Sequence, residues 1–287
     1  MGRIGLSIYR TCARQLAGRG LRKFAAVNSL NDWVVRKLKT KTAVVDGHLM
    51  HLDPRDSLDL SVNEVYEPFE TELVHQLVGK GDKVLDVGAN IGYYTLIFAR
   101  QVGACGRVFA FEPDPANFAL LKKNVESNGY KNVVLVNAAL SDQSGRLKLY
   151  LCDENRGDHR IYPSAENRQA IEIPAITADL CVGDQAGDIR FVKMDVQGAE
   201  GRVLLGMDRI LQGPGLKNVM LEFWPQGLRS AGNDPEQVLD LLKRQEFGFQ
   251  IIDQQRKQLS TVKPESLLRD FTMENGRQTN LLLSRCH

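Results

Sequence analysis

The sequence predicts an α/β protein built on a doubly wound parallel sheet, and two observations support this fold class. Short apolar runs, such as residues 84–87 and 189–194, alternate along the chain with segments whose apolar residues recur at helical spacing. Strands that are apolar throughout are typical of parallel sheets covered by helices on both faces. A glycine-rich turn also follows the first apolar run, where such sheets bind nucleotide-like ligands.

The predicted elements follow in a regular order. Residues 42–45 and 48–52 flank an Asp-Gly pair and predict a short hairpin, and residues 67–78 predict a helix that ends at Gly79. Strands are then expected at 84–87, 107–111, 132–136, 189–194, 218–223, 249–252 and 278–283, and helices at 91–102, 115–128, 199–211 and 235–245.

An insertion interrupts this alternation after the third strand. Residues 146–151 and 170–176 alternate between apolar and polar side chains, which predicts a hairpin-like pair of strands. Between them, residues 153–169 are polar and show no periodicity. We expect this polar segment to cover the substrate.

Charge divides the chain into a basic front and an acidic body. Residues 1–41 contain ten Lys or Arg residues and one acid, which leaves 27 basic and 34 acidic residues behind them. The net charge of +2 is therefore +9 in the front and −7 in the body. We predict a basic helical N-terminal extension at 1–41 and one domain at 42–287.

Three interpretations of the extension stay open. Apolar residues at helical spacing (Val27, Leu30, Val34 and Leu38) favour a helix docked on the domain with its cationic face in water. One alternative is an interfacial helix attracted to anionic lipid, which would give peripheral membrane contact. The other is an Arg-rich organelle transit peptide.

Composition excludes several classes of protein. No run of 18 apolar residues exists to span a membrane, and the five cysteines form no C-x-x-C pair. These cysteines favour a reducing, cytoplasmic location and disfavour a structural zinc site. Nucleic acid is not an expected partner, because the body is acidic and the basic segment is short.

The glycine-rich turn has the pattern D-x-G-x-x-x-G, formed by Asp86, Gly88 and Gly92. A dinucleotide-binding turn needs G-x-G-x-x-G, but Asn90 and Tyr93 occupy the places of its second and third glycines. A phosphate-binding G-x-x-x-x-G-K-[ST] does not occur. The turn therefore favours a nucleotide-like ligand without a pyrophosphate.

Acidic residues follow three successive strands of the predicted sheet. Asp86 can face an ammonium group, Glu112 can accept both hydroxyls of a ribose, and Asp142 can accept from an adenine amino group. The alternative is that these acids only cap strand ends. The constellation predicts a pocket for S-adenosylmethionine, with cofactor-binding residues Asp86, Gly88, Asn90, Gly92, Glu112 and Asp142.

Three residues are candidates for catalysis. Asp195 ends the fourth strand and Glu222 lies inside an apolar strand, where a carboxyl group needs a partner or a role. His159, with Asp158 and Arg160 beside it, could supply a base and a cation for an acidic substrate. The alternatives are a helix cap for Asp195 and a solvated loop residue for His159. We predict no metal site, although Asp195, Glu222 and Asp158 could converge on one.

Several blocks in order, over roughly residues 45–285, resemble the FkbM family of methyltransferases. They are 86–95, the block 111–117 that begins Phe-Glu-Pro-Asp, 137–142 with Gly145, 193–200, and Tyr66-Glu-Pro ahead of the first helix. The resemblance implies a class I methyltransferase (Rossmann-like) sheet of seven strands, the seventh antiparallel. It also implies S-adenosylmethionine as cofactor and O-methylation of a sugar or secondary metabolite.

Two positions depart from the family pattern. Gln197 stands where the family commonly has Glu, and Thr177-Ala-Asp-Leu180 reverses a common Leu-Asp order. We expect methyl transfer to a hydroxyl of a small molecule, namely a sugar, a polysaccharide unit or a secondary metabolite. The alternatives are a non-catalytic S-adenosylmethionine-binding protein and a methyltransferase with a nitrogen or protein acceptor. The sequence does not predict an oligomeric state.

Overall fold

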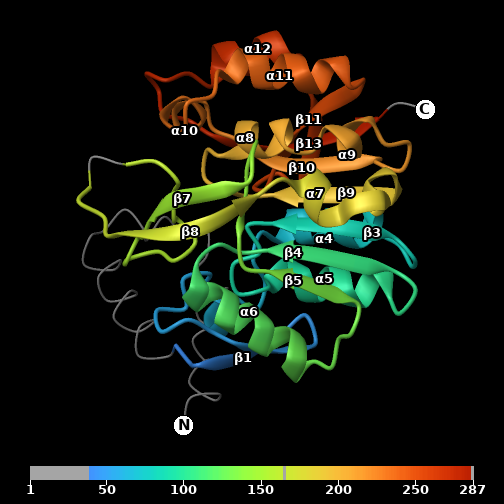
Figure 1. Ribbon diagram of the computed structural model, residues 1–287, viewed down its shortest axis with the longest axis vertical. Coiled ribbons are helices and arrows are strands. Elements are labelled where there is room, and N and C mark those ends of the chain that lie inside the picture. The colour runs from blue at the N-terminus through green and yellow to red at the C-terminus, as the bar shows by residue number, and fades with distance from the viewer. Residues whose placement is uncertain (1–38, 164–165, 286–287) are drawn as a thin grey trace.

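The computed structural model describes residues 39–163 and 166–285 of the chain (Figure 1). Almost all of the predicted basic extension, residues 1–41, lies outside the described residues. The description begins just ahead of a hairpin formed by β1 (Thr42–Val45) and β2 (His48–His51), as the Asp-Gly turn predicts. A short helix, α3 (Leu60–Asn63), then leads into the domain.

The main sheet has eight strands in the order β12-β11-β13-β10-β9-β3-β4-β5. β13 pairs antiparallel with both β10 and β11, and the pairs among β10, β9, β3, β4 and β5 are parallel. The strands are β3 (Lys83–Val87), β4 (Arg107–Phe111), β5 (Val133–Val136), β9 (Ile189–Met194), β10 (Asn218–Phe223), β11 (Phe247–Asp253), β12 (Gln258–Thr261) and β13 (Thr279–Arg285).

All seven predicted strands are present, and the antiparallel direction of the last one is confirmed. The prediction missed the eighth, β12, which pairs with β11 as a hairpin at the edge of the sheet. Its side chains are mostly exposed, so its sequence carries neither an apolar run nor a clear alternation.

Helices cover both faces of the sheet. Adjacent residues of a strand point to opposite faces, so Val84 and Leu85 of β3 belong to two separate hydrophobic cores. One core includes side chains of α4 (Pro68–Leu77), α5 (Tyr93–Val102) and α6 (Pro115–Ser127). The other includes side chains of α7 (Ala178–Val182), α8 (Glu200–Leu205), α9 (Asp208–Gln212), α10 (Pro225–Ser230), α11 (Pro235–Arg244) and α12 (Pro264–Asp270).

The single helix predicted at 199–211 is wrong, because α8 ends at Leu205 and α9 begins at Asp208. Gly206 lies at the break, and a Cβ there would come within 2.0 Å of the carbonyl oxygen of Ser141. The apolar spacing continues through the break because Leu204 and Met207 pack into the same core. Periodicity alone therefore could not reveal the close approach that divides the helix.

The insertion forms a separate three-stranded sheet, in the order β6-β8-β7, beside the main one (Figure 1). The predicted hairpin is confirmed as β7 (Gly145–Tyr150) and β8 (Ala170–Ile176), and β6 (Ala139–Leu140) adds to β8 in parallel. After β8 the chain passes through α7 and a 3-10 helix, η2 (Gly183–Asp188), before it enters β9.

Among the described residues, no helix is both long and apolar enough to cross a membrane.

Candidate active site

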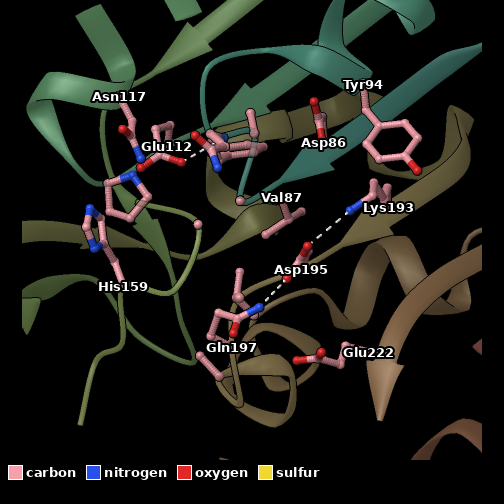
Figure 2. Close-up of a pocket in the computed structure, with 18 of the residues that line it drawn as sticks. Asp86, Val87, Tyr94, Glu112, Asn117, His159, Lys193, Asp195, Gln197 and Glu222 are labelled. Atoms are coloured by element: carbon pink, nitrogen blue, oxygen red, sulfur yellow. Dashed lines mark hydrogen bonds and ion pairs between the residues drawn. The ribbon is translucent and has the colours of Figure 1, made fainter. Parts of the chain in front are cut away.

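A cavity of about 370 Å³ lies at the carboxyl ends of β3, β4, β9 and β10 (Figure 2). Its volume falls in the range of small-molecule and cofactor sites, and its place is where doubly wound sheets bind ligands. The loops after β3 and β4 form one wall. The lining also includes residues 155–157, 159 and 161 of the insertion. Gln278, just before β13, and Asn280 of β13 line the cavity as well.

The turn after β3 owes its glycines to neighbouring protein atoms. Gly88 has φ +81°, and a Cβ there would lie 2.0 Å from the carbonyl oxygen of Asp195. Gly92 has φ +94°, and a Cβ there would lie 2.7 Å from the Cδ1 of Leu121. Gly88 and Asn90 line the cavity, but Gly92 does not. Gly92 therefore allows α5 to pack closely against α6, and its predicted contact with the cofactor stays a prediction.

Asp86 and Glu112 occupy the ends of β3 and β4, as predicted, and both line the cavity. Asp86 is buried and accepts a hydrogen bond from the Thr95 hydroxyl, and burial raises its pKa to about 6. Glu112 accepts from the backbone amides of Asn90 (2.8 Å) and Asp114 (2.9 Å). Burial raises the pKa of Glu112 to about 8. Protein donors thus hold both carboxyl groups in place at the cavity wall.

Asp142 does not take part in this arrangement. Its side chain accepts from the Ser141 hydroxyl at 2.8 Å and lies 3.6 Å from the Arg202 guanidinium, outside the cavity lining. The prediction placed Asp142 just beyond the third strand, but β6 intervenes and joins the second sheet. Because the chain passes through β6, Asp142 lies away from the cavity, and residues 138–140 line the cavity instead. The predicted adenine contact of Asp142 is therefore not supported.

We expect Glu112→Gln to weaken S-adenosylmethionine binding by at least about tenfold, and Asp142→Ala to change it less than about twofold. Glutamine puts an NH2 donor in place of one acceptor oxygen, and a buried polar group left without its partner costs about 1–3 kcal/mol, on the order of tenfold in affinity. Isothermal titration calorimetry of the two variants measures both effects. Equal losses of affinity in the two variants would contradict this placement of the cofactor.

Sheet register brings a second group of charged residues together on the opposite wall. Asp86 pairs with Lys193 across β3 and β9, and both point to the same face. Two residues further along, the same face carries Asp195, Glu222 and Asn280, since Met194 is in register with Leu221 and Glu222 with Asn280. Neighbouring strands are about 4.8 Å apart, so Asp195 and Glu222 lie side by side at the cavity.

Lys193 holds a buried positive charge among these acids. Its amino group lies 3.6 Å from Asp195 Oδ2 and 4.6 Å from the centre of the Tyr94 ring (Figure 2). Burial would lower the pKa of Lys193, but the carboxylates of Asp195, Glu67 and Glu70 raise it well above its usual range. The ammonium group therefore stays charged, and it offsets part of the negative charge around it.

Asp195 and Glu222 each have one oxygen held by an amide side chain. Gln197 Nε2 donates to Asp195 Oδ1 at 2.7 Å, and Gln278 Nε2 donates to Glu222 Oε1 at 2.8 Å. The second oxygen of Glu222 is buried and has no hydrogen-bond partner within the described part of the chain. Burial, followed by the nearby carboxylates of Asp195 and Glu200, raises the pKa of Glu222 to about 9. Glu222 is therefore mostly protonated at neutral pH.

His159 lies apart from these two carboxyl groups, beside Glu112 and Asn117 (Figure 2). Its Nδ1 accepts from the backbone amide of Cys152 at 3.0 Å, and its Nε2 lies 3.5 Å from Asp114 Oδ2. The structure thus places His159 on the same side of the cavity as Glu112.

The neighbours of His159 form ion pairs of their own. Asp158 pairs with Arg160 at 2.8 Å and with Arg168 at 2.7 Å, and it does not line the cavity. Asp158 therefore does not converge with Asp195 and Glu222, a possibility that the sequence left open, and it pairs with Arg160 away from the cavity lining. Within residues 39–163 and 166–285, no cluster of His, Cys, Asp or Glu could hold a metal ion.

The sequence interpretation missed three residues of this wall. Lys193 carried a usable signal, because a lysine inside a strand expected to be buried needs an acidic partner. Glu67 also lines the cavity, and burial raises its pKa to about 8. Gln278 comes from the far end of the chain, and nothing in its local sequence connects it to Glu222.

Comparison with known proteins gives a family and several relatives. The family model described as Methyltransferase FkbM domain matches residues 86–251. The hexuronic acid methyltransferase AglP of Haloferax volcanii is 28% identical over 236 residues, which cover 78% of this chain and 90% of that protein.

Solved structures with similar chains include two methyltransferases. One, from Streptococcus mutans in complex with SAH, has a TM-score of 0.44 at 12% identity and covers 76% of this chain and 97% of that one. The other, Methyltransferase FkbM from Methylobacillus flagellatus KT, has a TM-score of 0.42 at 14% identity and covers 79% and 52%. The family match spans more than half of the chain and includes the turn after β3, the ends of β4 and β9, and Glu222. This protein belongs to the FkbM family of methyltransferases, and its cofactor is S-adenosylmethionine.

Proposed function

We propose that this enzyme transfers the methyl group of S-adenosylmethionine to a hydroxyl of a small molecule, namely a sugar, a polysaccharide unit or a secondary metabolite. The observation that carries the proposal is the free, buried oxygen of Glu222 beside Asp195 at the cavity. A hydroxyl is a very weak acid, so its methylation depends on a positioned base more than methylation of an amine does. The curated relative named for hexuronic acids supports an acceptor of the sugar type.

The cavity residues fit the cofactor at two anchored carboxyl groups. We assign Asp86, held by Thr95, to the ammonium group, and Glu112, held by Asn90 and Asp114, to the ribose hydroxyls. S-adenosylmethionine supplies an electrophilic methyl group on a positively charged sulfur. The surplus of buried carboxyl groups around Lys193 suits a cationic cofactor, because each lies in a wall of low dielectric.

The protein must align the acceptor oxygen with the methyl group. It must also take up the proton of the acceptor hydroxyl. In our assignment Glu222 Oε2 accepts this proton, because no donor from residues 39–163 or 166–285 occupies this oxygen. Gln278 fixes the carboxyl group through the other oxygen, so the free oxygen keeps one direction. Positioning of this kind supplies much of the rate enhancement of a two-substrate reaction.

Incubation with methyl-labelled S-adenosylmethionine tests the proposal. Purified enzyme is supplied with a panel of methyl glycosides and with a small-molecule extract, and labelled products are identified by mass spectrometry and NMR. We expect label on an ether oxygen, and we expect none with Glu222→Gln. Label on nitrogen or on protein would contradict the hydroxyl acceptor. Cofactor binding without any transfer would support a non-catalytic binding protein instead.

A further inference from the structure

The acceptor wall presents two carboxyl groups in a repeated arrangement. Asp195 directly follows β9, Glu222 belongs to the neighbouring strand β10, and both line the cavity. Each is held through one oxygen by an amide side chain, Gln197 in the first case and Gln278 in the second. The two amides come from separate segments, one after β9 and one just before β13. Each carboxyl group thus has a fixed plane and one oxygen left for a ligand.

The remaining oxygens have unfilled hydrogen-bonding capacity. Glu222 Oε2 is buried without a hydrogen-bond partner in the described residues, which is costly unless a ligand fills it. Asp195 Oδ2 faces Lys193 at 3.6 Å, which is too long for a hydrogen bond. Because both residues line one cavity, these two oxygens can accept from two donor groups of one ligand when Glu222 is ionised.

The surrounding charge selects the kind of donor. Glu67 also lines this cavity, and its carboxyl group acts with those of Glu70 and Asp195 on the ammonium group of Lys193. A carboxylate on the substrate would be repelled by the carboxyl groups of this wall. Lys193 could not compensate, because these carboxyl groups already offset its charge. Hydroxyl groups, which donate without carrying charge, suit the wall better.

We propose that the acceptor is a vicinal diol, held at both hydroxyls by Asp195 and Glu222; this rests on the proposed function. One hydroxyl donates to Glu222 Oε2, and the neighbouring hydroxyl donates to Asp195 Oδ2 and is held without reacting. In the transfer step the hydroxyl oxygen forms a bond to the methyl carbon as the carbon–sulfur bond breaks. The electron pair of that bond stays on sulfur, which becomes a neutral thioether, and the hydroxyl proton passes to the Glu222 carboxylate.

Paired acceptors test the diol. The methyl α-glycosides of D-glucose, D-mannose and L-rhamnose are screened with labelled S-adenosylmethionine, and the methylated position is located by NMR. The methylated glycoside is then compared with the derivative that lacks the adjacent hydroxyl and with one that lacks a distant hydroxyl. We expect loss of the adjacent hydroxyl to lower kcat/KM at least about 100-fold, since a site that hydrogen-bonds a substrate hydroxyl strongly rejects its absence. Loss of the distant hydroxyl should lower kcat/KM less than about fivefold, because neither Asp195 nor Glu222 holds that hydroxyl.

The variant Asp195→Asn provides a second test of the diol proposal. An amide that replaces this carboxylate should raise KM for the diol more than it lowers kcat, because Asp195 holds the hydroxyl that does not react. With the adjacent-deoxy glycoside the same variant should have little further effect, as expected when both changes remove one interaction. Equal turnover of the diol and the adjacent-deoxy glycoside would overturn the diol proposal alone. Absence of methyl transfer to every hydroxyl, with the cofactor bound, would overturn the proposed function and this inference together.

Discussion

Gly88→Ala should weaken S-adenosylmethionine binding at least about 100-fold or prevent folding of the domain. A Cβ at this position would lie 2.0 Å from the backbone oxygen of Asp195, and backbone cannot move aside as a flexible side chain can. The residue also has φ +81°, which costs an L-residue roughly 1–2 kcal/mol. The ends of β3 and β9 would have to separate, and these ends carry Asp86 and Asp195. Calorimetric titration and thermal unfolding measure the two consequences.

Gly81→Ala is the matched control for this variant. Gly81 has φ +86°, close to that of Gly88, but among the described residues no heavy atom beyond its chain neighbours lies within 4 Å of its added Cβ. We therefore expect a modest loss of stability from the backbone conformation, with cofactor affinity within about twofold of wild type. Wild-type affinity in Gly88→Ala would show that the two strand ends can separate freely, contrary to the structure.

Glu222→Gln should lower kcat by roughly 10²–10⁴-fold, the usual contribution of a positioned general base. Its effect should depend on pH. Because the pKa of Glu222 is raised to about 9, the ionised form that can accept a proton is a minor fraction at neutral pH. Wild-type activity should therefore rise with pH, reach about half of its maximum near pH 9 and level off only above it, and Glu222→Gln should lose this rise. A variant that keeps both the rate and the pH profile of the wild type would exclude Glu222 as the base.

Stability of the cofactor-free protein provides an independent control for Glu222. The pKa of this carboxyl group is raised from 4.5 in the unfolded chain to about 9 in the folded one, so the folded state binds the proton more tightly. The contribution of this group to stability is thus present below about pH 4.5 and declines as pH rises toward 9. Glu222→Gln should have a higher Tm than the wild type at pH 8, and the difference should shrink toward pH 5. A Tm difference that does not change with pH would contradict the burial of an ionisable group at this position.

Periodicity and composition were sufficient for most of the architecture. The apolar runs located seven strands and predicted a mainly parallel sheet, because strands that are covered on both faces are largely apolar. The antiparallel direction of β13 came from the family resemblance. The edge strand β12 was missed because it is mostly exposed, so its sequence has no apolar run. The sequence did not reveal the break between α8 and α9, because both helices pack into one core. Only the close approach of Ser141 shows why Gly206 lies between them.

The part of the candidate site that depends on a local sequence motif could be predicted. Asp86, Glu112 and the glycine turn were identified from their places after predicted strands, and the structure brings them to one cavity. Asp142 satisfied the same local rule, yet an intervening strand carries it elsewhere. A position just after a strand is thus not sufficient to place a residue at this site.

The sequence by itself determined the fold class, the methyltransferase family and the two anchored carboxyl groups of the cofactor side, because short-range spacing encodes strands, turns and their ends. Only the tertiary structure decided the acceptor side. Lys193 and Asp195 come from β9 and the loop after it, Glu222 from β10 and Gln278 from just before β13, and sheet register alone makes them neighbours. Register depends on how whole strands pack, so it gives Glu222 a held oxygen, a free oxygen and a raised pKa that its own sequence neighbours do not specify.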